Sequence, residues 1–433
     1  MKKMTRRDFA KTGLAAGAVM GGLSVARSAH ANGGTEVLKV GLVGCGGRGT
    51  GAAHNALNAD PNTKIVAIGD LFKDRLANCA KNLKETFGDR APLTEADCFD
   101  GFDNYKQVIE KCDVVLLCST PHYRPIHLRA AVEAGKHVFF EKPVAVDPTG
   151  IRSVLESSRL GKEKGLTMVC GLCWRYHTAV QETMARVLGG EIGDLLAIQE
   201  TYLTGKLWTR PRQEGDTEMA FQNRNWYNFT WLSGDFNVEQ HVHSLDKALW
   251  AMGDQPPVDA WGVGGRMVRV EQPAYGDIYD LMGVTYNYPN GVKVHAFCRQ
   301  QNGCYNDTSD QFIGTKGTAN ILGNTISDLK GKVVWKYRGP GCDMYTNEHK
   351  YMFRSIRSGE ARNDGTFGAY STMLGILGRE CCYTGKKITW EEIMNSQQNL
   401  APTAYAMDGN PPTLPDENGH YLVALPGTGN HSI

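Results

Sequence analysis

The chain has 433 residues, with 47 Lys and Arg against 46 Asp and Glu and a formal net charge of +1 at pH 7. Charges of both signs run throughout, which argues against a nucleic-acid partner or an anionic membrane surface. Beyond the first 31 residues, the length suits two domains of ordinary size, and no later run is apolar and long enough to span a membrane.

Residues 1–31 have the pattern of an export signal. Gly13–Val25 is an uncharged apolar run, and Ala29-His30-Ala31 supplies the small residues that a signal peptidase reads. The pair of arginines resembles a twin-arginine signal and predicts export to the periplasm or beyond by the Tat machinery, with no membrane attachment after cleavage. The alternative is an uncleaved signal held in the membrane. The basic start contains Lys2, Lys3, Arg6 and Arg7.

Twelve cysteines in an exported chain raise the question of disulfides. Their placement argues against them, because Cys45 lies in a glycine-rich stretch and Cys118 in a strand-like run. A twin-arginine substrate also folds before export, in a reducing compartment. We therefore expect most of them to be small buried hydrophobic residues. Cys170-x-x-Cys173 leaves open a redox or metal pair.

Residues 37–58 predict a strand, a glycine turn and then a helix, the context of a dinucleotide-binding site. The first glycine permits the tight turn, the second lets the pyrophosphate approach the backbone, and the last lets the helix pack on the strand. The helix N-terminus then offers free N–H groups to the phosphates. The expected cofactor-binding residues here are Gly44, Gly46, Gly47, Arg48 and Gly49.

The next predicted strand, residues 64–70, ends at Asp70. It lies 70 − 49 = 21 residues after the last glycine, where an acidic residue binds the ribose diol, and this favours NAD. Lys73 and Arg75 leave NADP open, since either could reach a 2′-phosphate.

Further elements predict a doubly wound parallel sheet in residues 36–172. Continuous apolar runs at 112–120 and 137–143 are typical of buried parallel strands, and residues 125–136 between them predict a helix capped by Gly135. The fold class expected for this part is α/β, a Rossmann-type domain.

Thr120–Pro143, with its Glu-Lys-Pro turn, resembles the Gfo/Idh/MocA oxidoreductases. The resemblance covers nearly all of the mature chain. It implies NAD as the cofactor, with Thr120, Pro121 and Glu141 beside it, and a carbohydrate or polyol as substrate. It also implies that Lys142 lies beside the nicotinamide and the reacting hydroxyl.

A second matching segment is Trp231–Gly253, where the family carries Asp, His and Asp and this chain has Glu239, His243 and Asp246. His243 is the expected acid/base, with Glu239 orienting it or holding a substrate hydroxyl. Four residues apart on a helix, the two share one face. Glu239, His241 and His243 leave a metal site open, although residues two apart on a helix point to different faces, and we expect no metal.

Arg175 and Tyr176 lie at the expected junction between domains, where family members often carry an Arg-aromatic pair near the substrate. The resemblance implies that they bind substrate together with Asp246. A structural role at the junction is the alternative.

Residues 173–400 predict an α+β domain on a mostly antiparallel sheet, with a turn at Asn290-Gly291. An open sheet face predicts a homo-oligomer, a dimer or tetramer. Residues 401–433 are expected to be irregular. Four aromatics suggest either a ring-stacking wall for a sugar or core packing: Trp208, Trp226, Tyr227 and Trp231.

Export separates the enzyme from the cytoplasmic NAD pool, so the cofactor must travel bound and be regenerated in place. The first hypothesis is an oxidoreductase that returns the hydride to a second substrate. The second is a glycoside hydrolase that oxidises its sugar transiently, as certain relatives in the superfamily do. The third is a non-catalytic sugar-binding protein.

Overall fold

The computed structural model describes residues 36–270 and 273–433. The expected signal, residues 1–31, lies outside them. Within them, no helix combines the length and the apolar character needed to cross a membrane.

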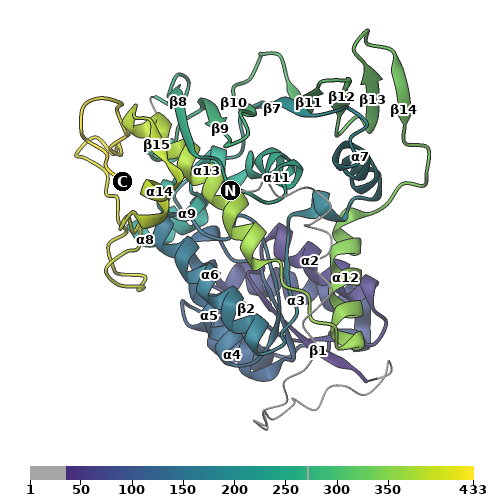
Figure 1. Cartoon of the computed structure of the whole chain (residues 1–433). Helices are drawn as coiled ribbons and strands as arrows, with labels where there is room; N and C mark the ends of the chain where they lie inside the picture. Colours follow the sequence, from purple (N-terminus) through teal and green to yellow (C-terminus); the bar gives the residue numbers. More distant parts are fainter. Residues whose placement is uncertain (1–35, 271–272) are drawn as a thin grey trace, which may run out of the picture.

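The first domain, in the lower half of Figure 1, is a parallel sheet of six strands in the order β3-β2-β1-β4-β5-β6. Helices cover both faces, which is why a strand such as β4 is buried along its whole length. The strands are β1 (Leu38–Val43), β2 (Thr63–Asp70), β3 (Cys98–Asp100), β4 (Val114–Leu117), β5 (His137–Phe140) and β6 (Met168–Cys170). The helices are α2 (Gly47–Ala59), α3 (Lys73–Phe87), α4 (Asn104–Lys111), α5 (Arg124–Glu133) and α6 (Pro148–Glu163).

The second domain is a sheet of nine strands in the order β14-β13-β12-β11-β7-β10-β9-β8-β15. All its pairs are antiparallel except β7 with β10. The strands are β7 (Leu195–Thr204), β8 (Asp259–Gly265), β9 (Leu281–Asn287), β10 (Lys293–Gln300), β11 (Asp307–Gly314), β12 (Gly317–Asn320), β13 (Thr325–Asp328), β14 (Val333–Lys336) and β15 (Ile388–Thr389). Together the two sheets confirm the predicted fold class.

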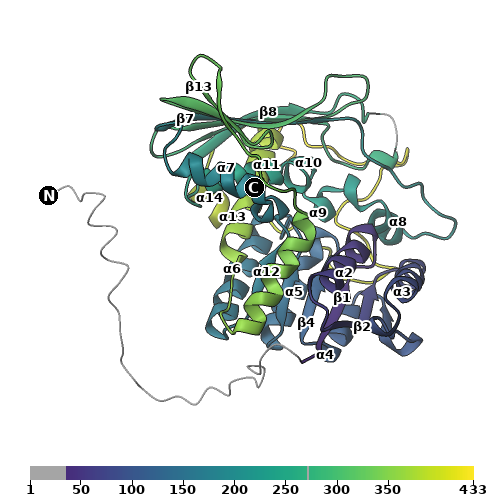
Figure 2. The ribbon, with the colours of Figure 1, turned by 90° about the vertical axis from the view of Figure 1, so that its right-hand side faces the viewer.

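Helices lie between this sheet and the first domain, and no helix of the described residues covers its outer face (Figure 2). They are α7 (Thr178–Leu188), α8 (Glu218–Arg224), α9 (Thr230–Ser233), α10 (Phe236–Glu239), α11 (Val242–Ala251), α13 (Gly365–Thr384) and α14 (Trp390–Asn395). The buried helix α13 packs against α6 of the first domain and β8 of the second. One apolar core therefore runs through both domains.

The expected division at residues 172 and 173 does not hold for α12 (Met344–Ser358). This helix returns to the first domain and packs on α2, with Met352, Phe353 and Ile356 in the core beneath β1. A parallel bridge from Met168 to Asn363 then extends the edge of the six-stranded sheet. A distant part of the chain thus covers a share of the apolar surface of α2.

Residues 401–433 form neither helix nor strand. They are nevertheless packed on the body of the protein, since the Tyr421 ring lies 4.9 Å from that of Phe229 and the Tyr405 hydroxyl lies 2.8 Å from His122 Nε2.

Candidate active site

The turn after β1 brings backbone segments too close for side chains at two of its glycines. Gly44 has φ +97°, and a Cβ there would lie 2.4 Å from the Cys118 and Ser119 backbone. A Cβ on Gly49 would lie 1.7 Å from the Gly44 carbonyl oxygen. By contrast, nothing lies within 4 Å of a Cβ built on Gly46 or Gly47, which leaves open space above the turn.

This open space faces the N-terminus of α2. The N-cap, Gly46, offers no side chain to the free N–H groups, and no acidic residue stands in the first turn. Unsatisfied N–H groups and the positive end of the helix dipole together attract an anion. The turn therefore fits a pyrophosphate.

Asp70 stands at the carboxyl end of β2, beside the glycine turn. Its carboxylate accepts hydrogen bonds from the backbone N–H of Cys45 at 2.7 Å and of Phe72 at 3.0 Å. Burial raises the pKa of Asp70, and the positive charge of Arg75 opposes that rise.

A cavity of about 630 Å³ extends from the glycine turn to the second domain. It brings together predicted residues from both domains: Gly44, Gly46, Gly47, Arg48, Gly49, Asp70, Thr120, Glu141, Lys142, Glu239 and His243. Pro121 does not line it and instead begins the short 3-10 helix η3 (Pro121–Tyr123).

Glu141 is held by an arginine of the glycine turn. Arg48 Nε lies 2.5 Å from Glu141 Oε1, and its Nη2 lies 3.5 Å from Glu348 Oε1 on α12. The Arg48 guanidinium also lies over the Tyr345 ring, 4.7 Å from its centroid. Burial and the charge of Glu141 raise the pKa of Glu348. Arg48 thus links the cofactor turn, the Glu-Lys-Pro turn and α12.

Lys142 is fixed from the opposite domain. Its Nζ donates to the Glu239 carbonyl oxygen at 2.5 Å and lies 2.9 Å from Glu239 Oε1. Both side chains are almost buried, at 12% and 11% exposed, so the pair is held with little competition from water.

His243 lines the same cavity, and its Nδ1 is buried without a hydrogen-bond partner in the described part of the chain. Burial, and then the charges of Lys142 and Lys247, hold the pKa of His243 well below its ordinary value. The imidazole is therefore neutral near pH 7, the form in which a ring nitrogen is free of a proton, and the same burial weakens it as a base.

The expected single helix across Glu239 and His243 is wrong. Helix α10 ends at Glu239 and α11 begins at Val242, so a break separates them. Both side chains still reach the cavity, whereas His241 does not line it and bonds through Nδ1 to Asn237 Oδ1 at 2.9 Å. Among the described residues, no cluster of three His, Cys, Asp or Glu side chains is arranged to hold a metal ion.

Arg175, Tyr176 and Asp246, the predicted substrate contacts, do not line the cavity. Arg175 Nη2 lies 2.8 Å from Asp246 Oδ1 and 2.7 Å from Asp254 Oδ1, and the Tyr176 hydroxyl donates to Asp364. The Asp246 contact ties α11 to the 3-10 helix η4 (Cys173–Tyr176), and the Tyr176 contact ties η4 to the N-cap of α13. The alternative, a structural role at the junction, describes them better.

Sequence reasoning missed several residues of the cavity wall. Tyr202 donates a hydrogen bond to Gln240 at 2.8 Å, and Tyr345 comes from α12, far along the chain. Of the four aromatics, Trp208 and Trp226 line the cavity, while Tyr227 and Trp231 are buried in the core. The cysteines are all free and mostly buried, including Cys170 and Cys173, as expected.

Residues 38–169 match the family model described as "Oxidoreductase family, NAD-binding Rossmann fold", GFO_IDH_MocA. The chain is 22% identical over 370 residues to myo-inositol 2-dehydrogenase of Thermotoga maritima, covering 82% of this chain and 100% of that protein. It is 33% identical over 127 residues to glycosyl hydrolase family 109 protein 1 of Bacteroides fragilis, covering 28% of this chain and 26% of that protein. Aldose-aldose oxidoreductase of Caulobacter crescentus has the same fold, with a TM-score of 0.63 at 15% identity over 82% of this chain and all of that one.

Proposed function

We propose that this chain, whose Rossmann domain belongs to the Gfo/Idh/MocA oxidoreductases, is an NAD-dependent oxidoreductase of a hydroxyl group on a sugar or cyclic polyol. One observation carries the proposal. Lys142, Glu239 and His243 line the same cavity as the glycine turn, which has the open space and the free N–H groups that a pyrophosphate requires.

NAD, when bound, supplies the hydride acceptor. The chain's own part is to move the proton and to hold the substrate. Neutral His243 accepts the hydroxyl proton as the C–H hydride leaves, and Lys142 stabilises the developing negative charge on that oxygen. Glu239 orients Lys142 through the 2.9 Å contact. The similarity to the Thermotoga myo-inositol 2-dehydrogenase supports a polyol as the substrate class.

Asp70 favours NAD over NADP, since a carboxylate at the ribose repels a 2′-phosphate. We further propose that residues 1–31 are a twin-arginine signal and that the protein leaves the cytoplasm with its cofactor bound. A second substrate then takes the hydride back, because free NAD is scarce outside the cytoplasm.

A glycoside hydrolase that works through transient oxidation is the second candidate. The match of 127 residues to a family 109 glycosyl hydrolase favours it, and the chemistry would use the same cavity.

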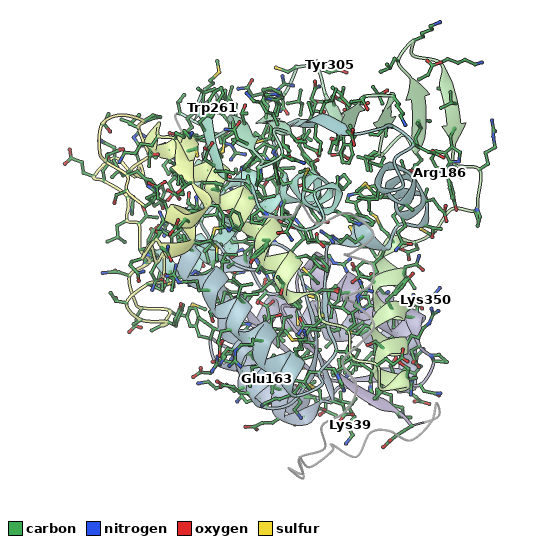
Figure 3. The ribbon with its side chains drawn as sticks, viewed as in Figure 1. Lys39, Glu163, Arg186, Trp261, Tyr305 and Lys350 are labelled. Atoms are coloured by element: carbon green, nitrogen blue, oxygen red, sulfur yellow. The ribbon has the colours of Figure 1, made fainter. Side chains whose placement is uncertain are left out.

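We also propose that the outer face of the nine-stranded sheet joins two copies of the chain. Large apolar side chains are exposed on it, including Trp261 at 49%, Val263 at 69% and Phe297 at 45%. Trp261 lies on the outer side of the molecule in Figure 3. Monomers rarely leave such a surface open, and two sheets pack well face to face.

The test is to denature the purified protein and measure the dinucleotide it releases, then to incubate native protein with polyols, aldoses and aryl glycosides without added NAD. Accumulation of a keto product supports the oxidoreductase, and release of the phenol supports the hydrolase. Release of no dinucleotide contradicts both and leaves a sugar-binding protein.

A further inference from the structure

Two arginines, one from each domain, line the cavity together with the glycine turn. Arg75 lies on α3, and Arg210 lies on the segment between β7 and α8. A second cavity, of about 970 Å³, adjoins the first and runs along α2 and α3. The two share five lining residues: Gly46, Gly47, Arg75, Arg210 and Arg224.

The three arginines differ in whether they form ion pairs with acidic side chains. Arg224 lies 3.3 Å from Asp74 and 3.4 Å from Asp216. Arg75 and Arg210 form no ion pair with any residue in 36–270 or 273–433. Arg75 lies over the Phe72 ring at 5.0 Å, and Arg210 over the Trp208 ring at 5.3 Å.

The backbone of Arg210 is anchored although its side chain is not. Its N–H donates to Asn225 Oδ1 at 2.8 Å, and Asn225 in turn donates to the Ala274 carbonyl oxygen. These bonds fix the segment at the cavity and leave the Arg210 guanidinium free to pair with an anion bound there.

We propose that Arg75 and Arg210 bind the pyrophosphate of the dinucleotide from the side opposite the α2 N-terminus. Release of the cofactor then requires both guanidinium groups to break their contacts with the phosphates. This rests on the proposed function. It gives the tight binding of the cofactor a physical basis, since the N–H groups of Gly46 and Gly47 hold one side of the phosphates and a charge from the second domain holds the other.

The test compares Arg210→Ala with Arg212→Ala. Arg212 lies two residues away on the same segment, but it pairs with Glu218, stacks on Phe221 at 4.3 Å and lines neither cavity. Each protein is loaded with NADH, and release is followed by nicotinamide fluorescence after addition of excess NAD. Thermal unfolding of the cofactor-free proteins checks that each variant is folded.

Arg210→Ala and Arg75→Ala are expected to release NADH about 10- to 100-fold faster than wild type, the range for loss of one charge-assisted hydrogen bond. Arg212→Ala should match wild type, and Arg210→Lys should recover part of the loss. Unchanged release in Arg210→Ala overturns the inference, as does a loss confined to NADPH, which would assign the arginine to the 2′-phosphate. Failure of the wild type to bind any dinucleotide contradicts the proposed function itself.

Discussion

Lys142 Nζ lies 2.9 Å from Glu239 Oε1, across the junction between the two domains. This contact places the ammonium group of the first domain beside the only carboxylate of α10, and His243 stands on the next helix along the same cavity. The proposed acid/base centre therefore requires the two domains to be packed together.

Replacing either His243 or Lys142 by Ala should slow hydride transfer by about 10²- to 10⁴-fold while NAD stays bound, because general acid–base groups contribute that much. Single-turnover reduction of the bound cofactor, read by absorbance, measures the step separately from product release. Glu239→Gln keeps the hydrogen bond to Lys142 and should cost less. A loss equal to that of His243→Ala would make Glu239 the acid/base, and near-normal rates in both Ala variants would remove the assignment.

A Gly→Ala substitution should have different effects at two positions of the glycine turn. Gly47→Ala places its Cβ in open space, so the protein should fold with an unchanged Tm yet bind NAD more weakly, because the methyl group enters the phosphate space. Gly49→Ala forces its Cβ against the Gly44 carbonyl at 1.7 Å and should lower both Tm and affinity. Thermal unfolding and titration calorimetry of the two variants check this. Equal Tm losses would show that Gly47 serves packing alone.

His349 makes the stability of the protein dependent on pH. The ring is fully buried on α12, with its centroid 4.3 Å from that of the Phe139 ring, and neither nitrogen is hydrogen-bonded within the described ranges. Burial, with the charge of Arg48, holds its pKa well below the ordinary value. Below about pH 6.5, His349 therefore binds a proton in the unfolded chain but not in the folded protein. The free energy of unfolding decreases as the pH falls.

His349→Phe should remove the share of that dependence that comes from this ring. The slope of unfolding free energy against pH between 6.5 and 5 should fall by up to about 1.4 kcal/mol per pH unit, the value for one proton. Urea unfolding at several pH values measures it. An unchanged slope would mean that His349 titrates alike in both states.

If the outer face of the nine-stranded sheet joins two copies, a charged residue placed on it should dissociate them. Val263→Asp or Phe297→Asp should convert the protein to monomers, since two carboxylates would be buried at each symmetric contact. Leu422→Asp is the matched control, an exposed leucine of the tail, 71% accessible. Light scattering after size exclusion reports the mass. A monomeric wild type would contradict the proposed interface.

Export should depend on Arg6 and Arg7. Changing both to Lys keeps the charge and is expected to retain the protein in the cytoplasm, because the arginine pair is read as an address. Cell fractionation with immunoblotting checks the location. A double variant that is still exported would indicate the general secretory route and would reopen the question of disulfides.

Local sequence features predicted the first domain well. The glycine turn, β1 and Asp70 lie within one βαβ unit, and their spacing along the chain is enough to predict a dinucleotide-binding site. The buried pairing of Asp246 with Arg175 was not predictable in the same way. Asp246 lies three residues after His243, but contacts with Arg175 and Ser371 hold it away from the cavity, and those contacts depend on how α11 packs against α13.

The sequence gives weaker indications of which residues of the second domain line the cavity. Trp208 and Trp231 look alike in the sequence, yet the first lines the cavity and the second is buried, because only packing decides between them. Nothing near Tyr345 or Glu348 marks α12 as a neighbour of the glycine turn.

The return of α12 to the first domain also bears on synthesis of the chain. Arg48 emerges from the ribosome 300 residues before Glu348, its partner on α12. Until then α2 lacks its apolar cover and the cavity lacks the wall that Tyr345 provides. A nascent or truncated chain that ends before residue 344 therefore cannot build the complete cofactor cavity. If the protein retains a dinucleotide, as proposed, that retention would report that synthesis has passed α12.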